Sequence, residues 1–195
     1  MRSVPTPDDR PAVRPTRDDV RAAVARNPRR MTVQLARELG VPEVEVIRAM
    51  PAGSVTELDE TRWEELVRSF ESIGDVHVIV TNGAVTLEAF GRFGNFSSFG
   101  EGENRYFNVQ SKSLDMHIRA AAIGPVFAVE KPGHMDGVKT LSCQFYHQDG
   151  FAAFKVFLTF GGTVPPTQRV EQFNAIRAQF GKMCPESDEN VGHRG

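Results

Sequence analysis

The sequence predicts an α+β fold with an N-terminal helical unit, an antiparallel β-sheet of about seven or eight strands, and a C-terminal helix. Apolar residues recur at helical spacing up to Gly74 and alternate with polar residues beyond it. Two turn signals, Asn82-Gly83 and Gln148-Asp149-Gly150, separate segments with this alternation. The 195 residues, 40% hydrophobic and 25% charged, are typical of one globular domain with a small accessory unit. This composition excludes a collagen-like, coiled-coil or wholly disordered chain.

The N-terminal region is expected to contain a tail followed by helices. Residues 1–16 predict a disordered tail, because prolines alternate there with charged residues. Residues 17–53 predict a small helical unit packed on the main domain. Thr32 is expected to cap a helix that Gly40 ends, and Pro42 is expected to open the next one. Helices are predicted over residues 18–26, over residues 33–39 and from residue 42 onward.

The main domain is expected over residues 54–181, and its first helix has the clearest pattern. Thr61 and Glu64 have the spacing of a capping box, and Gly74 is the expected end of the helix. One apolar face at helical spacing supports this helix. That face contains Trp63, Leu66, Val67, Phe70 and Ile73.

The remainder of the main domain is expected to be a sheet and a closing helix. Residues 91–104 predict a Gly- and Phe-rich loop, residues 165–180 a helix, and residues 182–195 a polar tail. The dense aromatic region between Phe90 and Phe180 is typical of a β core, and equally of a site for a flat apolar ligand. Strands are predicted over residues 75–81, 84–90, 105–110, 116–120, 125–131, 140–147 and 151–160.

The two helices that meet around Gly40 have the sequence shape of a helix-turn-helix, which suggests DNA binding. The helix after Pro42, however, carries Glu43 and Glu45, whose carboxylates would repel phosphate. We therefore expect a structural helical unit and no nucleic-acid partner. A ligand-sensing regulator with a helix-turn-helix remains the alternative.

The sequence also indicates the cellular location of the protein. No run of roughly 18 apolar residues and no apolar leader segment is present, so we expect no membrane partner. Cys143 and Cys184 form neither a disulfide framework nor a zinc motif. A cytoplasmic location is the expectation that follows.

Tyr106 and His117 are the candidate ligand residues. A hairpin turning at Ser111-Lys112 would make them direct cross-strand partners, with Cβ atoms about 4.5–5.5 Å apart on one face. So placed, a phenol and an imidazole could hydrogen-bond or approach one metal ion together, because both are ligands of ferric iron. The alternative is a buried Tyr-His pair that is fully hydrogen-bonded and binds no ligand. No nucleophile triad, phosphate loop or dinucleotide fingerprint is present, so the sequence carries no enzyme signature.

A series of short motifs from Asn27 to about Phe180 resembles the cytosolic haem-utilisation carrier family of the ChuX/HutX type. The series covers about four-fifths of the chain, and its order is more specific than any one motif. It begins with "LARELGVPEVEVIRAMP", and Trp63 then opens a helix. It continues with "GDVHVIV", "LEAFG", "RYFNV", "MHI", "FYHQDG", "FKVFL" and "EQFNAI".

The resemblance implies a mixed α+β fold, a homodimer, haem bound as cargo, and delivery of haem to a separate degrading protein. The family's haem-ligand tyrosine falls on Tyr106, the histidine of its Gly-His motif on His117, and the basic residue of its Phe-Lys motif on Lys155. Arg105 and Lys155 are the candidates for contacts to the haem propionates. The Phe-rich loop is expected to cover the porphyrin.

Four residues depart from the family pattern. Arg105 and Met116 replace glycines before Tyr106 and His117, and Thr159-Phe160 replaces the usual Gly-Arg. The leading hypothesis is an intracellular haem carrier that is not an enzyme. A haem-degrading enzyme and a relative that has lost haem binding are the alternatives, together with the regulator described above.

Overall fold

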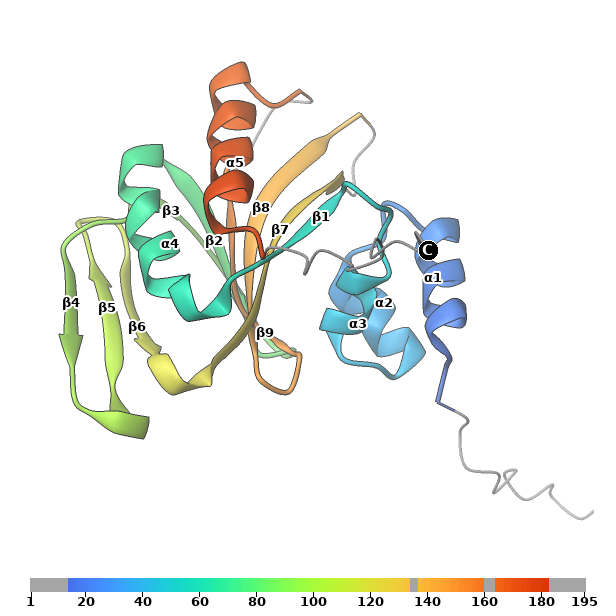
Figure 1. Ribbon diagram of the computed structural model, residues 1–195, viewed down its shortest axis with the longest axis horizontal. Helices are drawn as coiled ribbons and strands as arrows, with labels where there is room; N and C mark the ends of the chain where they lie inside the picture. The colour runs from blue at the N-terminus through green and yellow to red at the C-terminus, as the bar shows by residue number, and fades with distance from the viewer. Residues whose placement is uncertain (1–13, 134–136, 160–163, 183–195) are drawn as a thin grey trace, which may run out of the picture.

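The computed structural model describes residues 14–133, 137–159 and 164–182, and these form two antiparallel sheets and five α-helices (Figure 1). The six-stranded sheet has the strand order β1-β7-β8-β9-β2-β3, and the three-stranded sheet has the order β4-β5-β6. The strands of the larger sheet are β1 (Val55–Leu58), β2 (Val76–Thr81), β3 (Thr86–Gly91), β7 (Ile123–Pro132), β8 (Lys139–His147) and β9 (Ala152–Phe157). Those of the smaller sheet are β4 (Phe96–Phe99), β5 (Tyr106–Gln110) and β6 (Asp115–Arg119).

The helices are arranged on both sides of the larger sheet. The α-helices are α1 (Arg17–Arg26), α2 (Thr32–Leu39), α3 (Glu43–Arg48), α4 (Trp63–Ser69) and α5 (Thr167–Phe180). Short 3-10 helices are η1 (Glu60–Arg62), η2 (Phe70–Ile73), η3 (Gly102–Asn104) and η4 (Ala120–Ala122). In Figure 1, α1–α3 lie at one end of the molecule and the three-stranded sheet lies at the other. None of the helices in the described ranges is long and apolar enough to cross a bilayer.

The α+β prediction is confirmed, and the described residues contain nine strands rather than about seven or eight. Both predicted hairpins are present, because β2 pairs with β3 around Asn82-Gly83 and β8 pairs with β9 around residues 148–150. The sequence analysis missed β1, a four-residue strand that pairs with β7, and β4, which lies inside the predicted Phe-rich loop. Short strands like these carry too few alternating residues to be recognised.

The main core lies between the inner face of the six-stranded sheet and a layer formed by α4, α5 and the three-stranded sheet. The predicted apolar face of α4 supplies Trp63, Leu66 and Val67, and η2 continues it with Phe70 and Ile73. Phe173 and Ile176 of α5 join the same cluster. Gly74 ends the helical segment with φ of 89°, a conformation that favours glycine, as expected.

The helical unit packs on the opposite face of the six-stranded sheet. It has its own small core between α1, α2 and α3. Val44 and Ile47 of α3 are buried against Phe127 of β7 and Tyr146 of β8. The packing on the main domain that the sequence predicts is therefore present in the described residues, while the exact division into domains remains a prediction. Gly40 ends α2 in the left-handed conformation, as expected.

Two capping predictions are wrong. Thr32 is the first residue of α2 rather than its cap, because its hydroxyl donates to the carboxylate of Glu43 instead of accepting from the helix. Thr61 and Glu64 form no capping box. Asp59 accepts from the backbone N–H of Thr61 at 3.0 Å and begins η1 one turn earlier. The predicted disordered tail falls outside the described residues over 1–13, as does the polar tail over 183–195.

Candidate functional site

The pairing of β5 with β6 differs from the predicted register. Tyr106 lies opposite Arg119, and His117 lies opposite Asn108, so Tyr106 and His117 are not direct cross-strand partners. The turn lies one residue further along the chain than expected, around Lys112 and Ser113. Ser111 donates its backbone N–H to the carbonyl of Leu114 at 2.9 Å, and its hydroxyl accepts from the N–H of Leu114 at 3.0 Å. The displaced turn is accompanied by burial of the Leu114 side chain in the main core, which favours this register over the predicted one.

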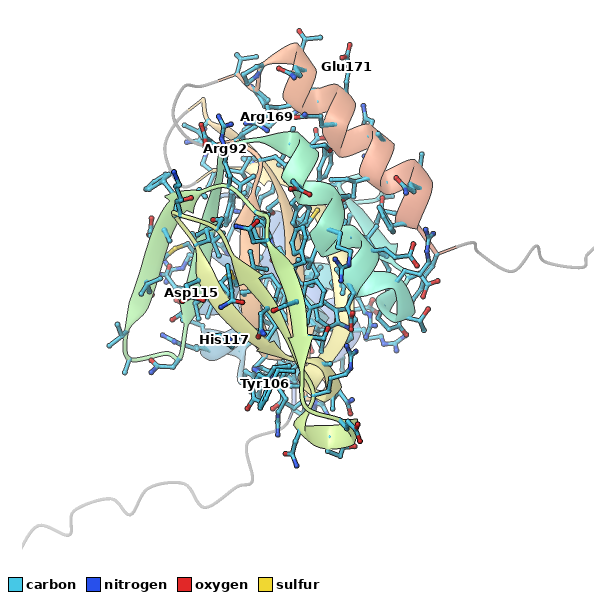
Figure 2. The ribbon with its side chains drawn as sticks, turned by 90° about the vertical axis from the view of Figure 1, so that its left-hand side faces the viewer. Arg92, Tyr106, Asp115, His117, Arg169 and Glu171 are labelled. Atoms are coloured by element: carbon cyan, nitrogen blue, oxygen red, sulfur yellow. The ribbon has the colours of Figure 1, made fainter. Side chains whose placement is uncertain are left out.

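Because the pairing shifts by two residues, Tyr106 and His117 still point to the same side of the sheet. The alternate residues Phe107, Val109 and Ile118 are buried against the core. We call the opposite side of β4–β6 the outer face. It faces the viewer in Figure 2, where Tyr106, Asp115 and His117 are labelled. The outer face consists of Ser97, Phe99, Tyr106, Asn108, Gln110, Asp115, His117 and Arg119.

The two tyrosines have opposite environments. Tyr146 is completely buried and donates its hydroxyl to Gln144 Oε1 at 2.7 Å. Burial, with the Glu43 carboxylate nearby, raises the pKa of Tyr146 well above its ordinary value, so this phenol stays protonated. Tyr106 is 37% exposed. Within the described ranges, Tyr106 is therefore the phenol that can reach a ligand.

His117 is held by the residue opposite it. Its Nδ1 lies 2.8 Å from Asn108 Oδ1, and its Nε2 lies 3.5 Å from the carboxylate of Asp115 on its own strand. Asn108 is 7% exposed and also donates from Nδ2 to the hydroxyl of Ser97 at 3.1 Å. The imidazole is thus oriented through Nδ1, while its Nε2 edge faces the open side.

Two further side chains complete the neighbourhood of Tyr106. Arg119 is its direct partner on β6, and among the described residues its guanidinium makes no ion pair. Phe99 is its direct partner on β4 and is 75% exposed. The outer face therefore brings together two residues of types that bind ferric iron, one uncommitted cation and one exposed aromatic ring.

The two residues expected to contact propionates lie elsewhere. Arg105 pairs with Glu64 of α4, on the side of the sheet opposite to Tyr106. The hydrogen bond to Glu64 raises the pKa of Arg105, so this guanidinium stays charged. Lys155 lies on β9 and pairs with Glu43 of α3 at 2.5 Å, where the helical unit packs on the larger sheet. The structure brings neither residue to the outer face.

The Phe-rich segment 91–104 is part of the sheet rather than a free loop. Phe93 is buried against Phe70, with ring centroids 5.2 Å apart. Phe96 stacks on Phe107 at 5.8 Å. Phe99 alone of these three points to the outer face.

Helix α4 fixes the three-stranded sheet from behind. The ring of Trp63 packs edge-on against Phe107, with centroids 5.4 Å apart. The Arg68 guanidinium lies over the rings of Phe96 and Phe107, at 5.2 and 4.9 Å from their centroids. The backbone that carries Tyr106 is thereby anchored, which a binding face requires.

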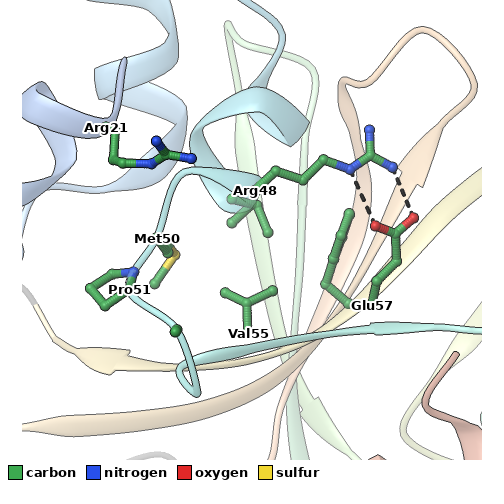
Figure 3. A pocket seen from close by; sticks show the side chains of 9 residues that line it. Arg21, Arg48, Met50, Pro51, Val55 and Glu57 are labelled. Atoms are coloured by element: carbon green, nitrogen blue, oxygen red, sulfur yellow. Dashed lines mark hydrogen bonds and ion pairs between the residues drawn. The ribbon is translucent and has the colours of Figure 1, made fainter. Parts of the chain in front are cut away.

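A hollow of about 440 Å³ lies at the far end of the molecule, between α3 and β1 (Figure 3). Its cation Arg48 is already bound by Glu57, through contacts of 2.8 and 3.2 Å, and lies over the ring of Phe127. Burial raises the pKa of Glu57, but hydrogen bonds from Arg48 and Lys182 outweigh it and hold that pKa below its ordinary range. The other cation of its lining, Arg21, pairs with Asp18 at 3.2 Å, and the hollow shares no residue with the outer face.

The sequence analysis missed Asn108 and Arg119. Both follow from the alternation of strand residues once the register is known, because they share a face with Tyr106 and His117. The missing information was that the turn lies one residue further along the chain, around Lys112 and Ser113. With the correct turn, "RYFNV" and "MHIR" would have identified both residues.

Comparisons with known proteins give one consistent fold. The crystal structure of ChuX is 22% identical, with a TM-score of 0.69 over 82% of this chain and 96% of that one. A protein from Erwinia carotovora is also 22% identical, with a TM-score of 0.72 over 83% of this chain and 98% of that one. Apo-PhuS, a heme-binding protein from Pseudomonas aeruginosa, is 17% identical, with a TM-score of 0.68 over 91% of this chain and 52% of that one.

ChuS, an E. coli heme oxygenase, is 14% identical, with a TM-score of 0.65 over 78% of this chain and 47% of that one. No curated protein sequence matches the chain significantly. The family model for haem utilisation of the ChuX/HutX type matches residues 56–176, which is more than half of the chain. The protein therefore belongs to the ChuX/HutX haem-utilisation family.

Proposed function

We propose that this protein is an intracellular haem carrier that binds ferric haem on the outer face and passes it to a haem-degrading protein. The observation that carries the proposal is the placement of Tyr106 and His117 on one solvent-facing side of a rigid sheet. Membership of a haem-utilisation family and the similarity to ChuX and PhuS support haem as the ligand. The donor atoms, a phenol oxygen and an imidazole nitrogen, are chemically suited to ferric iron.

In this proposal Tyr106 supplies the phenolate ligand and His117 the alternative ligand beside it. Arg119 takes the role that the sequence analysis gave to Arg105 and Lys155. Its guanidinium lies in register with Tyr106 and is free to bind a propionate. Phe99 offers an apolar surface next to the porphyrin plane.

A carrier of this kind has no need of catalytic groups. Tyr106, His117 and Arg119 reach from one face, so the chain itself holds the iron from one side only. The proposed assembly is a homodimer of about 43 kDa, twice the 21.6 kDa of one chain. We place this assembly in the cytoplasm, where the degrading protein would receive the haem.

The helical unit is proposed as structural. The first turn of α3 would have to enter the major groove if the unit bound DNA as a helix-turn-helix. Val44 and Ile47 of α3 are instead buried on the six-stranded sheet, and the Glu43 carboxylate is buried with them. This packing favours a carrier over a ligand-sensing regulator.

Hemin titration of the full chain tests the proposal. We expect the parent protein to show a phenolate-to-iron charge-transfer band, and Tyr106→Phe to abolish it. Arg119→Gln is expected to weaken hemin binding about 10-fold, because one charge-assisted hydrogen bond is lost. Arg92→Gln is the matched control. Arg92 is an exposed arginine that pairs with Asp75 and lies at the other end of the molecule in Figure 2, so hemin affinity should not change.

Three results would each count against this proposal. Saturable binding that survives in Tyr106→Phe with an unchanged spectrum would show that Tyr106 is not the ligand. Cleavage of the porphyrin ring after addition of a reductant would identify an enzyme. Absence of saturable hemin binding in the parent would identify a relative that has lost this activity.

A further inference from the structure

A continuous hydrogen-bond chain crosses the outer face and ends on His117. Ser97 donates its hydroxyl to Gln110 Oε1 at 3.2 Å and accepts from Asn108 Nδ2 at 3.1 Å. Since the Asn108 amide donates to Ser97 on one side, its carbonyl oxygen faces His117 on the other. A carbonyl oxygen accepts hydrogen bonds only, so Nδ1 of His117 must be the donor at 2.8 Å.

We propose that Asn108 is a positioning residue that holds His117 in the tautomer protonated at Nδ1. In a neutral imidazole the other nitrogen, Nε2, then carries the lone pair. That edge faces the open side, where Asp115 is the nearest acidic group at 3.5 Å. The proposal rests on the function proposed above, and it assigns His117 the role of an iron ligand through Nε2.

This arrangement also excludes one role considered for His117. A neutral imidazole whose Nδ1–H is committed to Asn108 has no second N–H to donate to the phenolate of Tyr106. Tyr106 and His117 are diagonal neighbours on one face, in register with Arg119 and Asn108 respectively. They therefore offer an oxygen donor and a nitrogen donor side by side on one face.

The burial of Asn108 supports a fixed orientation. The side chain is 7% exposed and uses both its oxygen and its amide nitrogen on neighbours. In the structure Ser97 donates to Gln110 Oε1 and accepts from Asn108 Nδ2, which directs the Asn108 oxygen toward His117. Reversal of this chain requires the Asn108 and Gln110 amides to flip together, and His117 protonated at Nε2 would then report the reversed chain.

The test is a long-range ¹H–¹⁵N correlation of the full apo chain, labelled with ¹⁵N-histidine, at about pH 8.5, well above the ordinary pKa of histidine of about 6.5. His117→Gln identifies the resonances. We expect the parent to show a protonated Nδ1 and an unprotonated Nε2 at His117. Asn108→Asp should keep this pattern, because a carboxylate also accepts from Nδ1, and Asn108→Leu should lose it.

A second pair of variants guards against misfolding of Asn108→Leu. Ser97→Ala removes only the anchor of the amide, and we expect a smaller loss of the Nδ1–H form. Ser98→Ala is the matched control, since Ser98 is the next residue on β4 and points to the other side of the strand. It should leave the His117 signals unchanged.

Hemin titration completes the test. We expect Asn108→Leu to raise the hemin dissociation constant about 10–100-fold and Asn108→Asp to stay within a few fold of the parent, as for residues that orient metal-binding histidines. The inference is overturned if His117 of the parent is protonated at Nε2. It is also overturned if Asn108→Leu keeps the tautomer or the hemin affinity of the parent, and both outcomes hold even if hemin binds. If the parent binds no hemin, the proposed function fails, and the tautomer of the apo protein still decides whether Asn108 positions His117.

Discussion

Replacing Lys155 by methionine separates two roles for this lysine. The sequence analysis expected a propionate contact, whereas the structure places Lys155 in a buried ion pair with Glu43. The Glu43 side chain is 2% exposed and that of Lys155 is 12% exposed. Glu43 Oε1 accepts from both Lys155 and Thr32, and Oε2 has no hydrogen-bond partner among the described residues. Lys155→Met would therefore leave a buried carboxylate without its counter-charge.

The expected cost is large because desolvation of Glu43 is no longer compensated. Removing one partner of a buried ion pair costs about 3–5 kcal/mol of unfolding free energy. For a chain of this length, 1 kcal/mol corresponds to about 2–4 °C, so the melting temperature should fall by about 6–20 °C. Lys155→Met combined with Glu43→Gln removes both charges and keeps an acceptor for Thr32. The unfolding free energy of this double variant should lie within about 1–2 kcal/mol of that of the parent.

Urea unfolding followed by circular dichroism, with hemin titration of each folded variant, measures both roles. Lys139→Met is the matched control. Lys139 pairs with Glu130 at 2.5 Å in the same sheet, but its side chain is 55% exposed, so the loss should stay below about 1 kcal/mol. Hemin affinity should remain parental in all these variants. A Lys155→Met protein of parental stability that binds hemin weakly would refute the reasoning and restore the propionate role.

Other predictions follow from the same contacts. Gly150→Ala should lower the unfolding free energy by about 1–3 kcal/mol, as measured by thermal unfolding. The loss should exceed that of Gly102→Ala, because both glycines have positive φ but only at Gly150 would an added Cβ lie 2.9 Å from Pro42. The pKa of Glu57 is lower in the folded state than in the unfolded state. The ionised carboxylate therefore stabilises the fold at pH values above its unfolded pKa, and this stabilisation is lost as the pH falls through its folded pKa. Glu57→Gln should flatten the loss of unfolding free energy between about pH 5 and pH 3. Equal slopes would contradict this. The chain should show no sequence-selective gel shift at about 150 mM salt. Light scattering should give a homodimer, and a monomer at micromolar concentration would count against the proposed assembly.

Much of the fold could be predicted because its signals are local. The apolar spacing of Trp63, Leu66 and Val67 and the turn at Asn82-Gly83 depend only on neighbours in sequence. The caps at Thr32 and Thr61 could not be predicted in the same way. Glu43, eleven positions away from Thr32, binds its hydroxyl, and Asp59 binds the N–H of Thr61. Such competing partners are set by tertiary contacts.

The candidate site shows the same division. The common face of Tyr106 and His117 could be predicted, because a register shift of two residues leaves every side chain on the same side of the sheet. Their cross-strand partners depended on the position of one turn, and the burial of Leu114 favours the observed position. The roles of Arg105 and Lys155 depended on acidic residues far away in sequence, Glu64 and Glu43, and the local pattern carries no sign of those pairs.

The one-sided placement of the ligands has a consequence for how a carrier releases haem. Tyr106, His117 and Arg119 belong to adjacent strands and share one sheet face. In the proposed carrier they would therefore hold iron and propionate from the same side. In the proposed carrier, a ligand of the receiving protein can approach the opposite side of the iron before Tyr106 dissociates. Transfer then proceeds by exchange of one protein ligand for another, and haem is at no point free in water. If protein ligands bound the iron from both sides, one of them would have to dissociate before the receiving protein could bind. Haem transfer would then become slower as the affinity of the carrier for haem rises. A site open on one side allows high haem affinity together with fast transfer.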